Sequence, residues 1–342
     1  MGLLGLRGVR ENVALDLGTT STRIWIVGRG LVLDEPSKLL VRRGQIRDEI
    51  LAIGAEAHAI QGRTSGPVDV VHPLQDGIVT DFSMLECLVR YFLERTVGGF
   101  RGWFGPNVLT CIPDGLGEVE QRAVQDAIRK GGARSVRLVH RAVAAAIGAD
   151  LPVLTPRGHF ICDLGGGTTE VAVVSLGGAV SARSVPCGGA QMDHAIVATV
   201  LTRHGVHISL DTAREVKQSI GAASRLSPPI AMRVTGRDTQ NGIPRTVEVS
   251  SDEIGPALAP TLERVLDAIA RTLQETPAEL CGDLLDSGIV LTGGGAKLRG
   301  LAELLTDRTG LPTTTTSGPE HAVARGAGAV LADDALRARV AH

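Results

Sequence analysis

Polar and apolar residues alternate from Asn12 to about Leu33, and this period of two predicts three successive β-strands. The first apolar run ends in Asp16-Leu17-Gly18 and is followed by threonines. The same arrangement returns after Phe160, where Asp163-Leu164-Gly165 is followed by two more glycines and two threonines. Each turn is followed by β-branched residues, which favour a returning strand. The chain therefore carries a repeated hairpin, with one copy in each half.

Helices and strands continue the pattern in the first half of the chain. Apolar residues at helical spacing predict one helix over 82–95 and another over 118–130. The apolar run at 108–112 between them predicts a strand.

The second half repeats this order with a longer insertion. An Asn241-Gly242 turn between two strand-like segments predicts a hairpin. A stripe of apolar residues from Leu258 to Leu273 then predicts a long helix that faces a core. Ser250 and Glu253, at the start of that helix, have the spacing of a capping box.

A third glycine-rich turn follows the apolar strand predicted at 288–292. Gly293, Gly294 and Gly295 come directly after that strand, and residues 296–301 are typical of the start of a helix. Amide groups at a helix N-terminus can receive an anion or the edge of a nucleotide sugar.

A chain of 342 residues is long enough for two domains of ordinary size. We expect a first lobe over 12–146, with a small subdomain at about 34–72. We expect a second lobe over 147–335, with a small subdomain at about 186–255. Residues 1–11 would form a short apolar and basic N-terminal arm.

Composition narrows the class of protein. A formal net charge of −2, with no long block of lysine or arginine, provides no field to hold nucleic acid, so no such partner is expected. The five cysteines are odd in number and widely spread, which is typical of reduced core residues in a cytosolic protein. No apolar stretch could span a bilayer, and the N-terminus lacks the apolar core of a cleavable signal, so we expect a cytoplasmic protein.

The two Asp-x-Gly turns carry the candidate chemistry. Backbone N–H groups and hydroxyls at such hairpin tips can bind phosphate, and the carboxylates of Asp16 and Asp163 can hold a divalent cation. A single Asp-Leu-Gly-Thr sequence is more often a plain hairpin turn. Two copies at matching strand ends, together with the third turn, predict instead that two facing tips clamp one nucleotide.

Six segments, in order along nearly the whole chain, resemble the bacterial actin homologues of the MreB and Mbl family. The segments are Asp16 to Thr20, Pro73 to Gly77, Ala144 to Gly148, Gly165 to Val173, Leu291 to Ala296 and Val323 to Gly328. The phosphate motifs are shared with the wider superfamily of actins, heat-shock chaperones and sugar kinases. The longer matches point to the MreB and Mbl family itself.

The resemblance implies an α/β, actin-like fold, which is a duplicated ribonuclease H-like ATPase fold with two lobes and four subdomains. It implies ATP and Mg²⁺ as cofactors. It further implies self-association into membrane-associated filaments, which determine cell shape by organising the cell-wall synthesis machinery. The protein would then lie in the cytoplasm, peripherally at the inner face of the cell membrane.

The resemblance also assigns roles to individual residues. Asp16 and Asp163 would hold the metal ion through waters, because Mg²⁺ dehydrates reluctantly. Asp163 and Thr168 would take part in catalysis. The residues implied in binding the cofactor are Gly18, Thr19, Thr20, Ser21, Gly165, Gly166, Gly167, Thr168, Arg214, Glu215, Val216, Lys217, Gly293, Gly294, Gly295, Ala296 and Lys297.

Three segments depart from the family pattern. Where the family has a glutamate and a proline, and the glutamate orients the attacking water, this chain has Arg141 and Ala142. A guanidinium is a donor only and cannot accept a proton from that water, although it can neutralise phosphate charge. The charges of Arg214-Glu215 are exchanged relative to the family, and Ala190 stands in place of a usual aspartate. We therefore expect ATP to be bound and hydrolysed slowly or not at all.

Three of the few aromatic residues lie close together, at Phe100, Trp103 and Phe104, among glycines and beside Arg101. Such a segment suits insertion into an anionic bilayer surface. We expect it to contact the membrane, and the N-terminal arm could do the same.

Alternative functions stay open from the sequence. One is a regulatory actin homologue that neither polymerises nor hydrolyses ATP, which the three departures would suit. Another is a small-molecule kinase of the same superfamily, which would need a general-base carboxylate near the γ-phosphate, and no such motif is found. A chaperone ATPase would carry a substrate-binding domain after the nucleotide domain.

Overall fold

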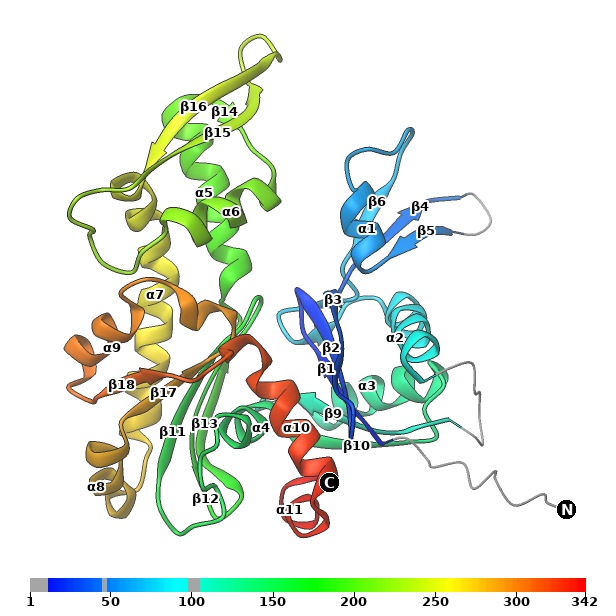
Figure 1. The fold of residues 1–342 in the computed structure, drawn as a ribbon, viewed down its shortest axis with the longest axis vertical. Helices are drawn as coiled ribbons and strands as arrows, with labels where there is room; N and C mark the ends of the chain where they lie inside the picture. The colour runs from blue at the N-terminus through cyan, green and yellow to red at the C-terminus, as the bar shows by residue number, and fades with distance from the viewer. Residues whose placement is uncertain (1–11, 45–47, 98–104) are drawn as a thin grey trace, which may run out of the picture. The chain divides into compact units, whose positions relative to one another are not determined.

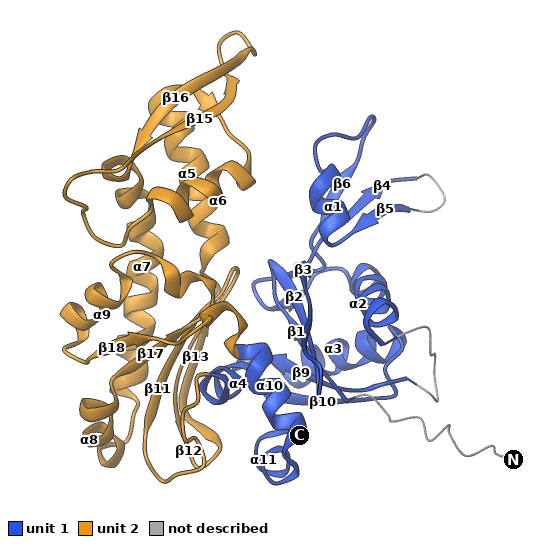
Figure 2. Ribbon diagram, viewed as in Figure 1, with its two compact units in different colours: residues 1–148, 323–342 blue, residues 149–322 orange. Residues whose placement is uncertain are grey.

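The computed structural model describes residues 12–44, 48–97 and 105–342. The chain forms two compact units (Figure 2). The first comprises Met1–Gly148 and Val323–His342, and the second comprises Ala149–Ala322. Each unit contains a five-stranded sheet with helices beside it (Figure 1).

The main sheet of the first unit has the strand order β3-β2-β1-β9-β10. The first three strands along the chain are antiparallel neighbours, and β9 and β10 run parallel to β1. The predicted succession of three strands is confirmed. The bounds are β1 Asn12–Leu17, β2 Ser21–Ile26, β3 Gly30–Pro36, β9 Asn107–Ile112 and β10 Ser135–His140.

The main sheet of the second unit has the order β13-β12-β11-β17-β18, with the same strand directions. Strand for strand, it repeats the sheet of the first unit. The repeated hairpin of the sequence is therefore the centre of a duplicated sheet. The bounds are β11 His159–Leu164, β12 Thr169–Ser175, β13 Gly178–Val185, β17 Ile289–Thr292 and β18 Thr313–Thr315.

The first unit also contains a three-stranded sheet of order β5-β4-β6 and a small β7-β8 hairpin. These strands are β4 Leu39–Arg42, β5 Glu49–Ile53, β6 Asp69–Val71, β7 Leu74–Gln75 and β8 Ile78–Val79. Its helices are α1 Ala55–Ile60, α2 Phe82–Val97, α3 Glu118–Lys130, α4 Arg141–Gly148, α10 Ala322–Ala332 and α11 Asp334–Val340. The helices predicted over 82–95 and 118–130 are confirmed by α2 and α3.

The second unit has its own three-stranded sheet, of order β14-β15-β16. These strands are β14 Val206–His207, β15 Ala231–Asp238 and β16 Pro244–Ser250. The helices are α5 Gly189–His204, α6 Leu210–Ile220, α7 Ser251–Gln274, α8 Ala278–Ser287 and α9 Leu301–Thr309, with short 3₁₀ helices η2 Gly294–Lys297 and η3 Pro319–His321.

Helix α7 carries the predicted apolar stripe into the core of the second unit. Leu258, Leu262, Val265 and Ile269 are buried there, and α7 contacts β12 and β13. The predicted capping box is wrong, because the Ser250 side chain makes no capping hydrogen bond. Glu253 Oε2 instead lies 2.8 Å from His204 Nε2 on α5.

The end of the chain packs on the first unit. Helix α10 comes close to α4 there. A Cβ at Gly326 would overlap the carbonyl oxygen of Ala144, and a Cβ at Gly328 would overlap the ring of Trp25. Arg325 Nε also donates to the Gly148 carbonyl oxygen at 2.6 Å. The predicted bounds of the lobes and of their small subdomains stay a prediction.

The cysteines differ in burial. Cys111, Cys162 and Cys187 are buried, Cys281 is exposed, and all five thiols are free. Burial raises the pKa of the Cys162 thiol, which keeps it neutral within the core. Over the described residues, the structure contains no helix with the length and apolar character required to cross a bilayer.

The α10–α4 contact leads to a stability prediction. We expect Gly326→Ala to lower the free energy of unfolding by about 2 kcal/mol, because overpacked cores typically lose ~1–3 kcal/mol. Gly282→Ala in α8 is the matched control, since its new Cβ would meet nothing within 4 Å. Helix propensity predicts that this control gains up to ~1 kcal/mol. Chemical denaturation measures both, and equal effects of the two substitutions would contradict the packing described here.

Candidate functional site

A tight turn joins β1 to β2 in the first unit. The Gly18 N–H donates to the Ser21 carbonyl oxygen at 3.0 Å, which closes a four-residue loop. Thr19, Thr20 and Ser21 are partly exposed there. The Ser37 N–H donates to the Thr20 carbonyl oxygen at 3.1 Å and ties the turn to the chain after β3. The turn is thus fixed in shape while its hydroxyls stay within reach of solvent.

The turn between β11 and β12 has the same local geometry. The Gly165 N–H donates to the Thr168 carbonyl oxygen at 2.9 Å. A Cβ at Gly165 would lie 2.8 Å from that oxygen, and a Cβ at Gly18 would lie 2.8 Å from the Ser21 carbonyl oxygen. Glycine is therefore required sterically at both positions, for the same reason.

The N-terminus of α5 supports the second turn. The Gly189 and Ala190 N–H groups donate to the carbonyl oxygens of Gly165 and Gly166, at 3.0 and 2.7 Å. A Cβ at Gly188 would lie 2.5 Å from the Gly165 oxygen, so only glycine permits this approach. Sequence reasoning assigned no role to Gly188. The pair Gly188-Gly189 at the start of α5 was the sequence signal that could have indicated this role.

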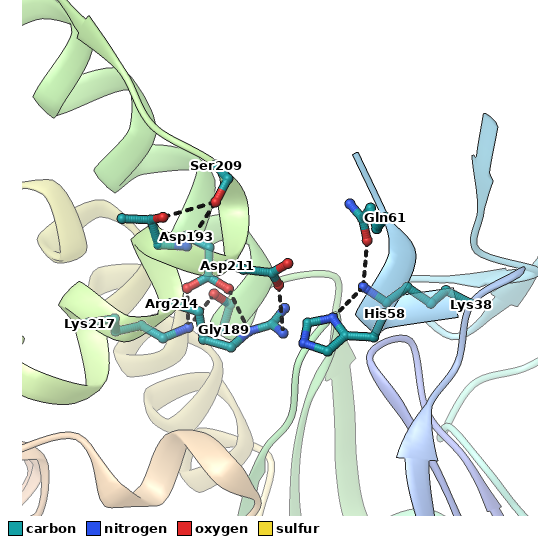
Figure 3. Close-up of polar contacts among 10 residues, drawn as sticks. Lys38, His58, Gln61, Gly189, Asp193, Ser209, Asp211, Arg214 and Lys217 are labelled. Atoms are coloured by element: carbon teal, nitrogen blue, oxygen red, sulfur yellow. Dashed lines mark hydrogen bonds and ion pairs between the residues drawn. The ribbon is translucent and has the colours of Figure 1, made fainter. Parts of the chain in front are cut away.

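Lys217 links α6 to the same place (Figure 3). Its Nζ donates to the Gly189 carbonyl oxygen at 2.6 Å and lies 2.6 Å from Oδ1 of the buried Asp193. Burial lowers the pKa of Lys217, and the Asp193 carboxylate opposes that shift. Arg214 Nε lies 3.4 Å from Oδ2 of the same carboxylate. The lysine predicted to bind the cofactor thus holds two helices together.

The other two residues predicted on α6 differ in exposure. Val216 is buried in the core of the second unit, whereas Glu215 is exposed. Of the four predicted residues on α6, Arg214 and Glu215 present polar side chains at the surface.

The third glycine-rich turn packs on the end of β11. A Cβ at Gly293, whose φ is +80°, would overlap the Leu164 carbonyl oxygen, and a Cβ at Gly295 would overlap the Leu164 side chain. Gly294 has open space around it. Ala296 is buried, and Lys297 Nζ donates to Glu320 Oε1 at 2.6 Å.

The prediction that residues 296–301 form the start of a helix needs correction. Gly294–Lys297 forms a short 3₁₀ helix, and α9 begins only at Leu301. Leu298 is extended and Gly300 is in the left-handed conformation. The backbone therefore leaves helical geometry between the 3₁₀ helix and α9.

The two predicted metal-binding carboxylates are both buried but lie in different surroundings. Asp163 is 1% exposed and accepts a hydrogen bond from Thr292 Oγ1 at 2.9 Å. Its cross-strand neighbour on β12 is the buried Glu170. Asp16 is paired instead with Arg141, whose Nη1 lies 2.6 Å from Asp16 Oδ1.

These surroundings test whether a divalent cation fits. Over the described residues, no group of three or more histidine, cysteine, aspartate or glutamate side chains could hold a metal ion. Mg²⁺ bound with a nucleotide needs only one or two carboxylates besides phosphate oxygens and waters. Asp163, a buried carboxylate beside the Thr292 hydroxyl, fits that donor set. Asp16 has the Arg141 guanidinium against its Oδ1, and its role as a metal ligand stays a prediction.

The predicted membrane contact concerns Phe100, Trp103, Phe104 and the arm 1–11. These residues lie outside the part of the chain that the structure describes. The membrane contact stays a prediction.

Comparison with known proteins places the chain in a family. The model of the MreB/Mbl protein family matches residues 10–338. The cell shape-determining protein MreB of Escherichia coli (strain K12) is 39% identical over 328 residues, which cover 95% of this chain and 94% of the relative.

Solved structures agree with that match. The crystal structure of MreB5 of Spiroplasma citri bound to AMPPNP has a TM-score of 0.88 and 31% identity, and the match covers 96% of this chain and 98% of that one. A MamK double helical filament has a TM-score of 0.80 at 19% identity, covering 95% and 99%, and so supports the fold alone. The actin-like α/β fold predicted from the sequence is confirmed. With a family model over nearly its whole length and relatives of this similarity, the chain belongs to the MreB/Mbl family.

Proposed function

We propose that the chain is an ATP-binding, actin-like cytoskeletal protein that forms filaments and helps to determine cell shape by organising cell-wall synthesis. The observation that carries this proposal is the matched pair of glycine turns, Gly18–Ser21 and Gly165–Thr168, at equivalent places in a duplicated sheet. Support also comes from the relatives. One is named a cell shape-determining protein, and another was crystallised with AMPPNP.

Each turn offers its own groups to phosphate. In the first unit these are backbone N–H groups and the hydroxyls of Thr19, Thr20 and Ser21. In the second they are the N–H groups after Gly165 and the Thr168 hydroxyl. Successive backbone N–H groups in a tight turn make a concave site for an anion, and hydroxyls add further donors. The hydrogen bonds that close both turns hold these groups in place before the ligand arrives.

Other residues would complete the site. Gly294, with open space around it, and the surface side chains Arg214 and Glu215 would border the nucleoside. Asp163 would hold Mg²⁺ through waters. Gly293, Gly295 and Lys217 would act indirectly, since they hold the third turn and α6 in place.

Hydrolysis would be slow or absent. Asp163 and Thr168 remain the proposed catalytic residues. Orienting an attacking water needs an acceptor, and Arg141 carries donors only. Its guanidinium is also bound to Asp16, which holds it in the first unit.

Filaments would lie at the inner face of the cell membrane. Phe100, Trp103, Phe104 and the arm 1–11 would provide the contact with the bilayer, and the cell-wall synthesis machinery would be the partner. The comparisons do not favour the alternatives of a regulatory homologue or a small-molecule kinase.

The turn geometry leads to a binding prediction. We expect Gly18→Ala and Gly165→Ala each to weaken ATP binding by about 10- to 100-fold, because hydrogen bonds to charged groups are worth ~1.5–3 kcal/mol. Isothermal titration calorimetry measures the affinity. Gly255→Ala in α7 is the control, since its new Cβ would come no closer than 3.9 Å to the Ala222 carbonyl oxygen. Undiminished binding in both turn variants would rule out the proposed phosphate site.

Filament formation and hydrolysis can be measured together. We expect the protein to pellet on centrifugation equally well with ATP and with AMPPNP, while phosphate release stays near background. The reason is that Arg141 cannot accept a proton from water. Stoichiometric phosphate release during assembly would refute slow hydrolysis. Absence of a pellet with either nucleotide would refute the filament proposal.

A further inference from the structure

The fold brings Arg141 to Asp16 although 125 positions separate them in the sequence. Strands β1, β9 and β10 run parallel, so their carboxyl ends lie at one edge of the sheet. Asp16 is the penultimate residue of β1, and Arg141 directly follows β10. The phosphate turn Gly18–Ser21 begins two residues after Asp16. The guanidinium therefore lies at the edge of the sheet that carries this turn.

Fixed positive charge faces both oxygens of the Asp16 carboxylate. Arg141 Nη1 lies 2.6 Å from Oδ1, and Nη1 of the cross-strand residue Arg23 lies 3.6 Å from Oδ2. The Asp16 side chain is 0% exposed, and those of Arg141 and Arg23 are 12% and 15% exposed. A guanidinium stays protonated at every pH at which proteins fold. The carboxylate therefore has a permanent counter-charge inside the protein.

The equivalent carboxylate of the second unit has different neighbours. Asp163 accepts from the neutral Thr292 hydroxyl, and its cross-strand neighbour is Glu170, where Asp16 has Arg23. The duplicated sheet thus places the acidic Glu170 opposite Asp163 and the basic Arg23 opposite Asp16. The backbones of the two turns match, but the charged side chains beside the aspartate that precedes each turn differ.

We propose that Arg141 takes the place of a divalent cation at Asp16. Its guanidinium is a resident positive charge beside the turn Gly18–Ser21, and Asp16 positions Arg141 and is not a metal ligand. The inference rests on the proposed nucleotide function and specifies it further. The phosphate at the turn Gly18–Ser21 therefore needs no cation at Asp16, and the Mg²⁺ that Asp163 would hold adds little to the affinity for the nucleotide.

Nucleotide binding tests the inference directly. We expect the full chain to bind ATP with affinities that agree within about threefold in Mg²⁺ and in EDTA. In Arg141→Gln, binding in EDTA should fall by about 30-fold, since one charge-assisted contact is lost, and Mg²⁺ should restore it. Arg137→Gln is the matched control, because Arg137 is an exposed arginine on β10. It should behave as the unmodified chain does.

Two results distinguish failure of the inference from failure of the proposed function. If the unmodified chain binds ATP tightly in Mg²⁺ and about 30-fold more weakly in EDTA, Arg141 does not replace the cation, although the nucleotide function stands. If ATP binds under neither condition, the proposed function fails and the inference fails with it.

A second measurement needs no nucleotide and covers the case in which Arg141→Gln folds poorly. Removing one partner of a buried ion pair leaves an uncompensated charge, which destabilises the fold. We expect Mg²⁺ alone to raise the melting temperature of Arg141→Gln by about 3 °C or more, because the cation can now bind Asp16. The unmodified chain and the double variant Asp16→Asn with Arg141→Gln should not respond. An equal response of all three proteins would overturn the exchange of guanidinium for cation.

Discussion

One backbone hydrogen bond in each unit, from a glycine N–H to the carbonyl oxygen three residues later, determines the shape of the candidate site. It closes Gly18–Ser21 after β1 and Gly165–Thr168 after β11. Neither turn tolerates a side chain at its glycine, since a Cβ would lie 2.8 Å from the accepting oxygen. The two turns fix the register of the β1–β2 and β11–β12 hairpins. Asp16 and Asp163 therefore lie at equivalent positions.

Burial of those two aspartates is the second constraint. A carboxylate removed from water needs hydrogen bonds or a counter-charge. Asp163 has a hydroxyl donor from β17, and Asp16 has two guanidinium groups from β2 and α4. The same backbone arrangement therefore stabilises a buried aspartate in two ways, by a hydroxyl donor at Asp163 and by guanidinium groups at Asp16. The departure at position 141, which sequence reasoning linked to lost hydrolysis, also changes what Asp16 can bind.

The sequence predicted the features that depend on local pattern. The repeated hairpin, the helices near 82–95 and 118–130, and the apolar stripe of α7 follow from periodicity, which backbone geometry determines. The candidate turns could also be predicted from the sequence, because a glycine at the end of a strand indicates a tight turn that leaves no room for a side chain.

Features that depend on contacts between distant segments could not be read from the sequence. The ion pair of Asp16 with Arg141, the bond of Lys217 to Gly189 and the packing of Gly326 on α4 all join segments far apart in the chain. Ser250 and Glu253 fail as a capping box for the same reason, since His204 on α5 engages the glutamate. Periodicity gives the elements, but only the fold shows which side chains meet.

Hydrogen exchange of backbone amides, with and without ATP, tests the central claim that each of the two turns binds the phosphates of a nucleotide. The account predicts slower exchange at Gly18–Ser21 and at Gly165–Thr168, with the same dependence on ATP concentration. Protection of one turn alone, or of neither, would contradict it.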